Sequence, residues 1–241
     1  MRTRILACTG LLLTVLLGGC AHGGYGAVRA VPMEPDTPPV ATNDRATYLG
    51  LIRTMQERGL FYASLAHIDA YRAAYGDSPE LSRLQADALR ETDQQDRAME
   101  RYRGLLTSPQ AAAAWHGIGL IEASQGHMGE ATHALDEAVH RDPTNAVYLG
   151  DLGYARIRAD DDRGAREPLA KAAELDPRNA KAVANLALLF TLEGDDATAT
   201  QLMDRAALSA TARAEVQRLA GEIRRDRRPD AATTMTQGHT P

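Results

Sequence analysis

Apolar and small residues recur in the middle of the chain with the spacing of paired helices. One pattern occurs twice there, first from Trp115 and again from Leu149, with the same offset at every position. The first copy has Trp115, Ile118, Gly119, Ala131, Leu135, Ala138 and Pro143, and the second has Leu149, Leu152, Gly153, Ala165, Leu169, Ala172 and Pro177. Apolar positions three and four apart mark one face of a helix. Each copy therefore predicts two helices that cross at glycine and alanine, with a proline that ends the unit.

A repeat of roughly 34 residues with these small residues and this closing proline resembles the tetratricopeptide repeat (TPR) family. The resemblance implies an all-α solenoid of helix-turn-helix units, which stack because one unit cannot bury its apolar face alone. The likeness is strong in the regular units 112–145 and 146–179, continues from Ala180, and is weaker in two units before Pro109. We predict about four to five repeats and a C-terminal capping helix, which together form a domain over residues 45–225.

Three segments depart from the regular repeat pattern, and each leads to a separate structural prediction. The second unit has an extra residue between its two apolar stripes, which predicts an insertion in the turn between its helices. Pro168 falls inside a predicted second helix and should kink that helix or delay its start. Residues 226–241 are expected to form a disordered tail. The basic run 224–228, which overlaps its start, is expected to be a solvated end, the alternative being a contact with anionic lipid or a partner.

The N-terminus has the composition of an export signal. Residues 1–19 contain Arg2 and Arg4 followed by an apolar stretch, which is shorter than the roughly 20 residues needed to span a bilayer. The ending Leu17-Gly18-Gly19-Cys20 resembles a bacterial lipobox, which implies cleavage before Cys20 and its acylation. Because alanine rather than aspartate follows Cys20, the resemblance implies the periplasmic face of the outer membrane. The alternative is an ordinary cleaved signal with an incidental cysteine.

The composition of the mature chain adds little about the class of function. Residues 20–44 are rich in glycine and proline, which predicts a flexible tether. With Cys8 inside the signal, the mature monomer has no cysteine pair for a disulfide. Loss of Arg2 and Arg4 leaves 25 basic against 32 acidic residues, which argues against nucleic-acid binding.

The TPR register predicts a partner-binding groove along the first helix of each unit. Its lining would be His116, Leu120, Val147, Tyr154, Ile157, Arg158, Lys181, Leu188 and Thr191. This mostly apolar set suits an amphipathic helix or hydrophobic segment of a partner. Asn185 alone matches the residues with which some TPR proteins hold a terminal carboxylate. The alternative is that Leu120, Tyr154 and Leu188 pack between units.

The sequence has no pattern typical of a catalytic or metal site. It contains no nucleophile elbow, phosphate loop or acid and base pair, so no enzyme activity and no cofactor are predicted. His133 and His140 lie two turns apart on one predicted helix but have no third ligand nearby in the sequence, and no metal is predicted. Residues 160–162 are three aspartates without the spacing of a calcium loop, so they are expected to cap the following helix.

A narrower resemblance rests on Asp151-Leu-Gly-Tyr-Ala, on residues 165–177 and on Ala184-Asn-Leu-Ala-Leu-Leu, after a lipoprotein signal. Together these are similar to the TadD family of tight-adherence (Flp) pilus assembly lipoproteins. The resemblance implies an adaptor that binds a secretin or another assembly subunit, in a pilotin-like role. Two alternatives remain: a TPR lipoprotein for outer-membrane protein insertion or peptidoglycan enzymes, and an envelope enzyme on a TPR scaffold.

Overall fold

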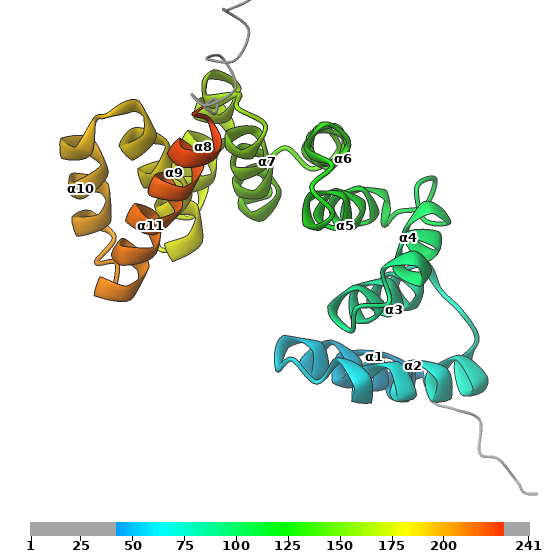
Figure 1. Ribbon diagram of the computed structural model, residues 1–241. Helices are drawn as coiled ribbons and strands as arrows, with labels where there is room; N and C mark the ends of the chain where they lie inside the picture. The colour runs from blue at the N-terminus through cyan, green and yellow to red at the C-terminus, as the bar shows by residue number, and fades with distance from the viewer. Residues whose placement is uncertain (1–41, 229–241) are drawn as a thin grey trace, which may run out of the picture. The chain divides into compact units, whose positions relative to one another are not determined.

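The computed structural model describes residues 42–228, and every regular element in that range is an α-helix (Figure 1). The helices are α1 (Thr42–Glu57), α2 (Phe61–Tyr75), α3 (Pro79–Glu91), α4 (Gln95–Arg103), α5 (Ala111–Ser124), α6 (Met128–Arg141), α7 (Ala146–Arg158), α8 (Asp162–Leu175), α9 (Ala180–Glu193), α10 (Asp196–Arg205) and α11 (Ala210–Asp226). None of these helices is long and apolar enough to cross a membrane. The predicted signal, Cys20 and nearly all of the tether lie outside the described residues, as does the tail from residue 229.

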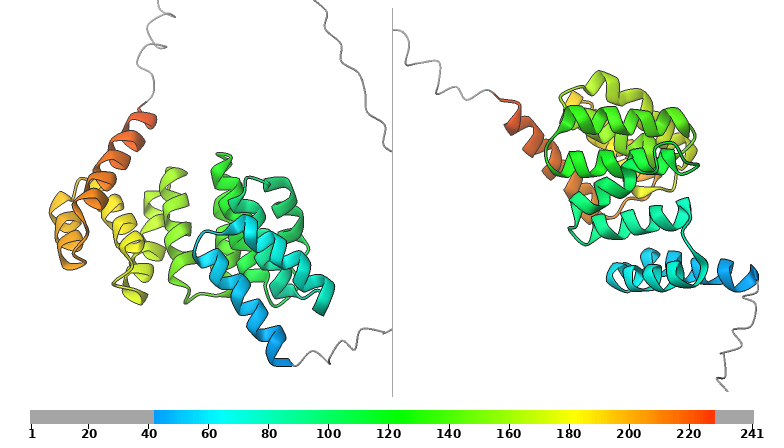
Figure 2. Two further views of the ribbon diagram at one scale, coloured as in Figure 1. Left: turned by 90° about the horizontal axis from the view of Figure 1, so that it is seen from below. Right: turned by 90° about the vertical axis from the view of Figure 1, so that its right-hand side faces the viewer.

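The first ten helices form five hairpins that stack in chain order, and Figure 2 shows neighbouring pairs side by side. From the second repeat on, each first helix packs more extensively against the second helix of the preceding repeat than against its first helix. The predicted all-α solenoid is therefore confirmed, with five repeats and α11 as the additional C-terminal helix.

Capping residues recur with the repeat and fix where the helices begin. Asn145 and Asn179 accept hydrogen bonds from the first backbone N–H groups of α7 and α9. Asp161 and Asp195 do the same for α8 and α10. Such caps satisfy N–H groups that have no partner within the helix. The expectation that the aspartate run caps the following helix is thus confirmed for Asp161.

In each of the two regular repeats, the paired helices cross at a glycine. A Cβ atom built on Gly119 would lie 2.6 Å from Cγ of Leu135, and one on Gly153 would lie 2.4 Å from Cγ of Leu169. Both distances are far shorter than an ordinary contact. Each glycine therefore lets the second helix of its own repeat approach closely, as the sequence pattern predicts.

The insertion predicted in the second repeat is wrong. Residues 92–94 separate α3 from α4, and the turns between α5 and α6 and between α7 and α8 are equally long. Asp93, Gly126 and Asp160 are the left-handed residues in the turns of the second, third and fourth repeats. The sequence separation from Asp93 to Gly126 is one residue shorter than that from Gly126 to Asp160. The second repeat is therefore shifted as a whole relative to the third, and Ala86 occupies the crossing position with no exposed surface.

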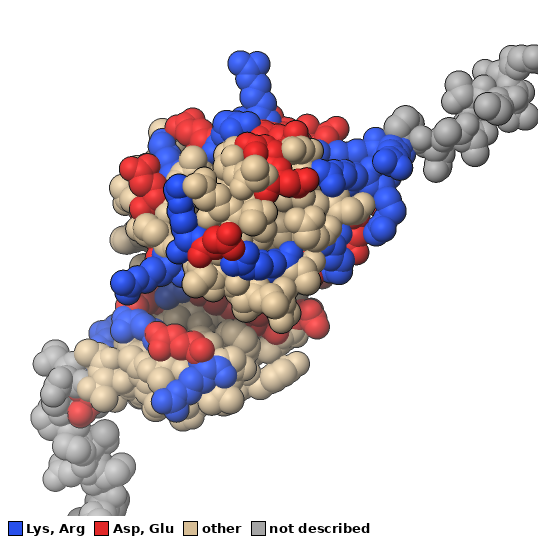
Figure 3. All heavy atoms as spheres, turned by 90° about the vertical axis from the view of Figure 1, so that its left-hand side faces the viewer, with Lys and Arg blue, Asp and Glu red and all other residues tan. Residues whose placement is uncertain are grey.

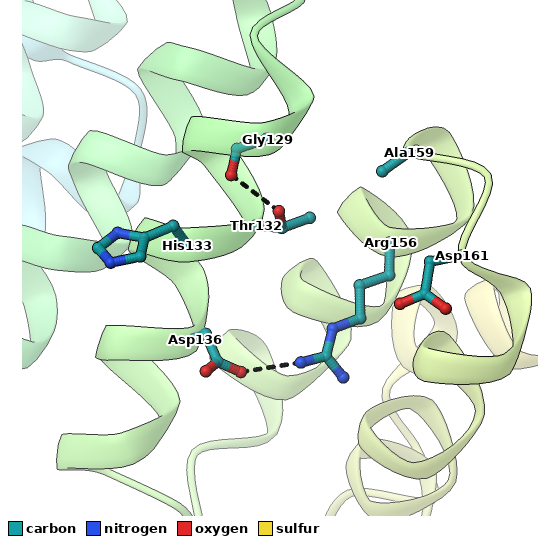
Figure 4. Close-up of a pocket in the computed structure, with 7 residues that line it drawn as sticks. All are labelled: Gly129, Thr132, His133, Asp136, Arg156, Ala159 and Asp161. Carbon is teal, nitrogen blue, oxygen red and sulfur yellow. Dashed lines mark hydrogen bonds and ion pairs between the residues drawn. The ribbon is translucent and has the colours of Figure 1, made fainter.

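Pro168 does not delay its helix, because α8 runs without a break from Asp162 to Leu175. A proline has no N–H to donate to the carbonyl four residues earlier, which here belongs to Gly164. Nη1 of Arg156 donates to that carbonyl at 2.8 Å. Nη2 of Arg156 donates to Asp136 at 2.9 Å (Figure 4). The Arg156 side chain thus replaces the missing bond and links three helices beside a polar hollow of about 280 Å³.

Candidate partner-binding surface

Three successive first helices are linked by one buried carboxylate. Oδ2 of Asp151 on α7 lies 2.8 Å from Nε2 of His116 on α5, and Oδ1 lies 2.6 Å from Nζ of Lys181 on α9. The ring of His116 also stacks on Tyr148, with centroids 4.5 Å apart. We call His116, Asp151 and Lys181 the Asp151 cluster. Because its members come from consecutive repeats, the cluster fixes the spacing of their first helices.

The Asp151 carboxyl is ionised despite its burial. Burial alone would raise its pKa, but the hydrogen bond from His116 and the charge of Lys181 outweigh this effect and hold the pKa below its usual value. Asp151 is 7% exposed, whereas the Lys181 side chain is 67% exposed. The cluster therefore presents a cation to solvent whose position is set by a buried anion.

A shallow cleft adjoins the cluster between α7 and α9. It is lined by Val147, Gly150, Asp151, Lys181 and Asn185, among others. The Asn185 amide donates to the Gly150 carbonyl at 3.3 Å, so it links α9 to α7. Val147 is 49% exposed and stands beside Lys181 in this lining. The arrangement offers an apolar contact and a fixed positive charge, which suits an amphipathic or acidic segment of a partner.

The predicted groove residues divide into three groups. Val147, Arg158 and Lys181 are exposed, while His116, Leu120 and Tyr154 are partly buried. Ile157, Leu188 and Thr191 are fully buried, so the expectation that they line an open groove is wrong. The physical reason is α11, because its Val216 and Leu219 line the same hollow as Leu188, and Arg227, directly after the helix, bonds to the Ile157 carbonyl.

Two residues that shape this surface escape a reading of the sequence. Asp151 is named from the sequence only as part of a family motif. A signal for it was available, because a carboxylate between Leu149 and Leu152 interrupts an apolar stripe. The prediction that Arg227 belongs to a solvated end and a disordered tail is wrong, because its side chain is partly buried and bonded to Asp160 and Asp162. No local pattern could have corrected it, because the contact with Asp162 joins residues 65 positions apart.

The histidines and aspartates of this region do not converge on a metal site. Among residues 42–228, no group of three or more histidine, cysteine, aspartate or glutamate side chains is placed to hold a metal ion. His133 lies against the Trp115 ring, with centroids 5.9 Å apart. Two of the three consecutive aspartates, Asp160 and Asp162, bind Arg227 instead.

Comparisons with known proteins agree with this architecture. No protein-family model matches the chain. The chain is 30% identical over 203 residues to the TPR repeat-containing protein PA4299 of Pseudomonas aeruginosa, covering 83% of this chain and 78% of that protein. Among solved structures, TTC0263, a thermophilic TPR protein of Thermus thermophilus, matches with a TM-score of 0.59 and 16% identity, covering 74% of this chain and 98% of that one. A structure from the functional characterization of Pseudomonas aeruginosa pilF matches with a TM-score of 0.61 and 19% identity, covering 76% and 85%.

The fold and its inner surface thus define a helical repeat protein that binds other proteins. The chain belongs to the TPR repeat-containing proteins. Such an array serves as a scaffold for protein–protein interaction, because its stacked helices expose an extended surface rather than an enclosed pocket. The structural matches share the fold alone with this chain, since their identities are only 16% and 19%.

Proposed function

We propose that this protein is a lipid-anchored adaptor on the periplasmic face of the outer membrane, and that it binds a subunit of a pilus or secretion apparatus. Its role toward an outer-membrane secretin would be pilotin-like. The signal and Cys20 support the anchor, and the likeness to TadD-family lipoproteins supports the pilus assignment. The observation that carries the binding role is the exposed Val147 beside Lys181, the solvent-exposed member of the Asp151 cluster.

The surface is suited to recognition because little of it must be ordered on binding. Lys181 is already held by Asp151 at 2.6 Å, and His116 is held by the same carboxylate and by Tyr148. Side chains fixed before association lose less conformational entropy in a complex. A partner segment with an apolar side chain over Val147 and a carboxylate near Lys181 would match this arrangement.

The binding role is tested by the double variant Val147→Glu and Lys181→Glu. We expect it to lose at least about tenfold in affinity for the partner, because it removes an apolar contact and reverses a charge at the centre of the surface. Leu175→Glu is the matched control, since Leu175 has the same 49% exposure but lies on a second helix, α8. The measurement is capture of a co-expressed secretin by each purified variant.

A double variant that captures the secretin as well as the Leu175→Glu control does would remove this surface from the mechanism. Capture of an outer-membrane insertion factor or a peptidoglycan enzyme, with no secretin bound by the unmodified protein, would favour general envelope biogenesis over pilus assembly.

The anchor is tested by Cys20→Ser, which removes the thiol that would be acylated. We expect the variant to stay as a precursor or to appear in the soluble periplasmic fraction, because the acyl chains, which contribute about 0.8 kcal/mol per buried CH₂, are the proposed direct attachment to the bilayer. Metabolic labelling with a palmitate analogue, followed by fractionation, measures both effects. Cys8→Ser is the control. Labelling that persists in Cys20→Ser would contradict the lipid anchor.

A further inference from the structure

The last helix does not continue the stacking pattern of the repeats. In the array each first helix packs more extensively on the preceding second helix than on the preceding first helix, whereas α11 packs chiefly against α9, the first helix of the fifth repeat. Figure 1 shows α11 lying across α9. The register places the inner surface of the fifth repeat at Lys181, Ala184 and Leu188, and these residues line a hollow together with Ala212, Val216 and Leu219 of α11. The counterpart of Leu188 in the fourth repeat is Tyr154, which is only partly buried, so α11 covers a surface that is more open in the repeat before it.

α11 docks through one apolar face. Val216, Ala220 and Ile223 are buried with a spacing of four and three residues, which is one stripe of a helix. They share a hydrophobic cluster with Leu188 and Ile157. The opposite side carries Glu215, Arg218 and Glu222, which pair with one another in solvent. α11 thus binds the array as an amphipathic helix binds a groove.

The C-terminal end of α11 is held by a dedicated set of acceptors. Nη1 and Nη2 of Arg227 donate to the two carboxylate oxygens of Asp162 at 2.8 and 2.7 Å. Nη2 also donates to the Ile157 carbonyl at 2.7 Å, and Nε lies 2.7 Å from Oδ1 of Asp160. A bidentate pair of this kind is among the stronger and more directional polar contacts. The turn between α7 and α8 therefore recognises an arginine at the end of a helix. Basic side chains gather at this end of the described chain (Figure 3).

The fit of α11 on this surface is incomplete. A hollow of about 250 Å³ remains between α9 and α11, beside the small side chains of Ala184 and Ala212. This hollow is partly open to solvent, so the apolar side chains on its walls lack protein contacts that a larger side chain would supply. A helix with a larger apolar residue at the position of Ala212 would fill the hollow and bind more tightly than α11 does.

We propose that the inner face of the fourth and fifth repeats is a binding site for an amphipathic helix, and that α11 occupies it until such a helix from a partner displaces it. The partner helix carries apolar residues at the spacing of Val216, Ala220 and Ile223, a large one in place of Ala212, and an arginine in its last turn. This inference deepens the proposed function, on which it rests for the existence of a partner. It names a second surface, covered by α11, which adjoins the first surface and shares Lys181 with it.

The test uses a labelled synthetic peptide with the sequence of residues 210–228 and the full chain. We expect the peptide to bind the Arg227→Ala chain at least about tenfold more tightly than the unmodified chain, because the resident helix then lacks its clamp while Asp160 and Asp162 stay free for the peptide. Fluorescence anisotropy gives the dissociation constants. Arg228→Ala is the matched control, since it removes the adjacent exposed arginine.

Two altered peptides test recognition itself. A peptide with Arg227→Ala should bind the Arg227→Ala chain about tenfold more weakly, and one with Ala212→Leu about tenfold more tightly, than the unmodified peptide. On an Asp162→Asn chain the first of these differences should largely disappear. Equal binding of all three peptides to the Arg227→Ala chain would overturn the proposal.

Displacement is measured on the unmodified chain, so that the result does not depend on any chain variant folding. Saturating Ala212→Leu peptide should accelerate amide hydrogen exchange in α11 while exchange in α1 stays the same. Unchanged exchange in α11 would refute displacement. Neither assay contains a secretin or a membrane, so failure here leaves the proposed function standing, and failure of secretin capture leaves this site standing.

Discussion

Gly117→Ala is expected to destabilise the second and third repeats strongly, although it adds a single methyl group. A Cβ atom at residue 117 would lie 2.2 Å from Cζ of Tyr102 and 2.5 Å from both Cε atoms. The Tyr102 ring has no exposed surface, and its hydroxyl donates to Asp87 at 2.7 Å, so the ring cannot move aside without breaking that bond. The methyl group must therefore separate α5 from α4.

Overpacking of a core costs about 1 to 3 kcal/mol, and the lost Tyr102 to Asp87 bond adds to that figure. Since about 1 kcal/mol lowers the melting temperature of a domain of this size by about 2–4 °C, we expect a fall of roughly 5 °C or more. Thermal melts followed by circular dichroism measure the change.

Gly150→Ala serves as the comparison, because its Cβ would make only an ordinary contact, 3.9 Å from Cβ of Ala172. Alanine is favoured over glycine in a helix interior by about 1 kcal/mol, so Gly150→Ala should melt at the same or a higher temperature. If both variants melted alike, the packing of Tyr102 against Gly117 would not exist in solution.

Leu188→Glu is expected to abolish the cooperative folding of the C-terminal repeats. Leu188 is 1% exposed and packs in the cluster that joins α7, α9 and α11. The change forfeits about 1.5 to 3 kcal/mol of apolar burial and places an unpaired carboxylate in the core at a further cost of several kcal/mol. The sum is a large part of the roughly 5 to 15 kcal/mol by which domains are stable.

Val147→Glu is the matched change at an exposed inner position and should alter stability by less than about 0.5 kcal/mol. Urea unfolding followed by circular dichroism distinguishes the two variants. A Leu188→Glu protein with the midpoint of the unmodified chain would mean that α11 does not cover α9 in solution, and it would remove the support for the proposed helix-binding site as well.

The sequence by itself determined the repeat architecture. Apolar residues three and four apart define helices, and Gly119 and Gly153 mark the positions at which paired helices cross. These features are local and recur once in each repeat, so one regular pair reveals the rule for its neighbours. The aspartate cap of α8 follows in the same way, since a cap acts within one turn of its helix. The sequence also predicted that Val147 and Lys181 lie on the inner surface, because the repeat register shows which side of a first helix faces away from the second helix of its repeat.

Only the tertiary structure decided how these surfaces are used. The burial of Ile157 and Leu188 depends on where α11 lies, and α11 is held by Arg227 through contacts with residues 65 to 70 positions earlier. The same is true of the Asp151 cluster, in which Asp151 bonds to residues 35 positions before it and 30 positions after it, and of Tyr102 over Gly117. The periodicity of a repeat sequence specifies which face of each helix is apolar. It does not specify whether that face meets solvent, the next repeat or a helix that folds back from the end of the chain, because each of these satisfies the same apolar pattern.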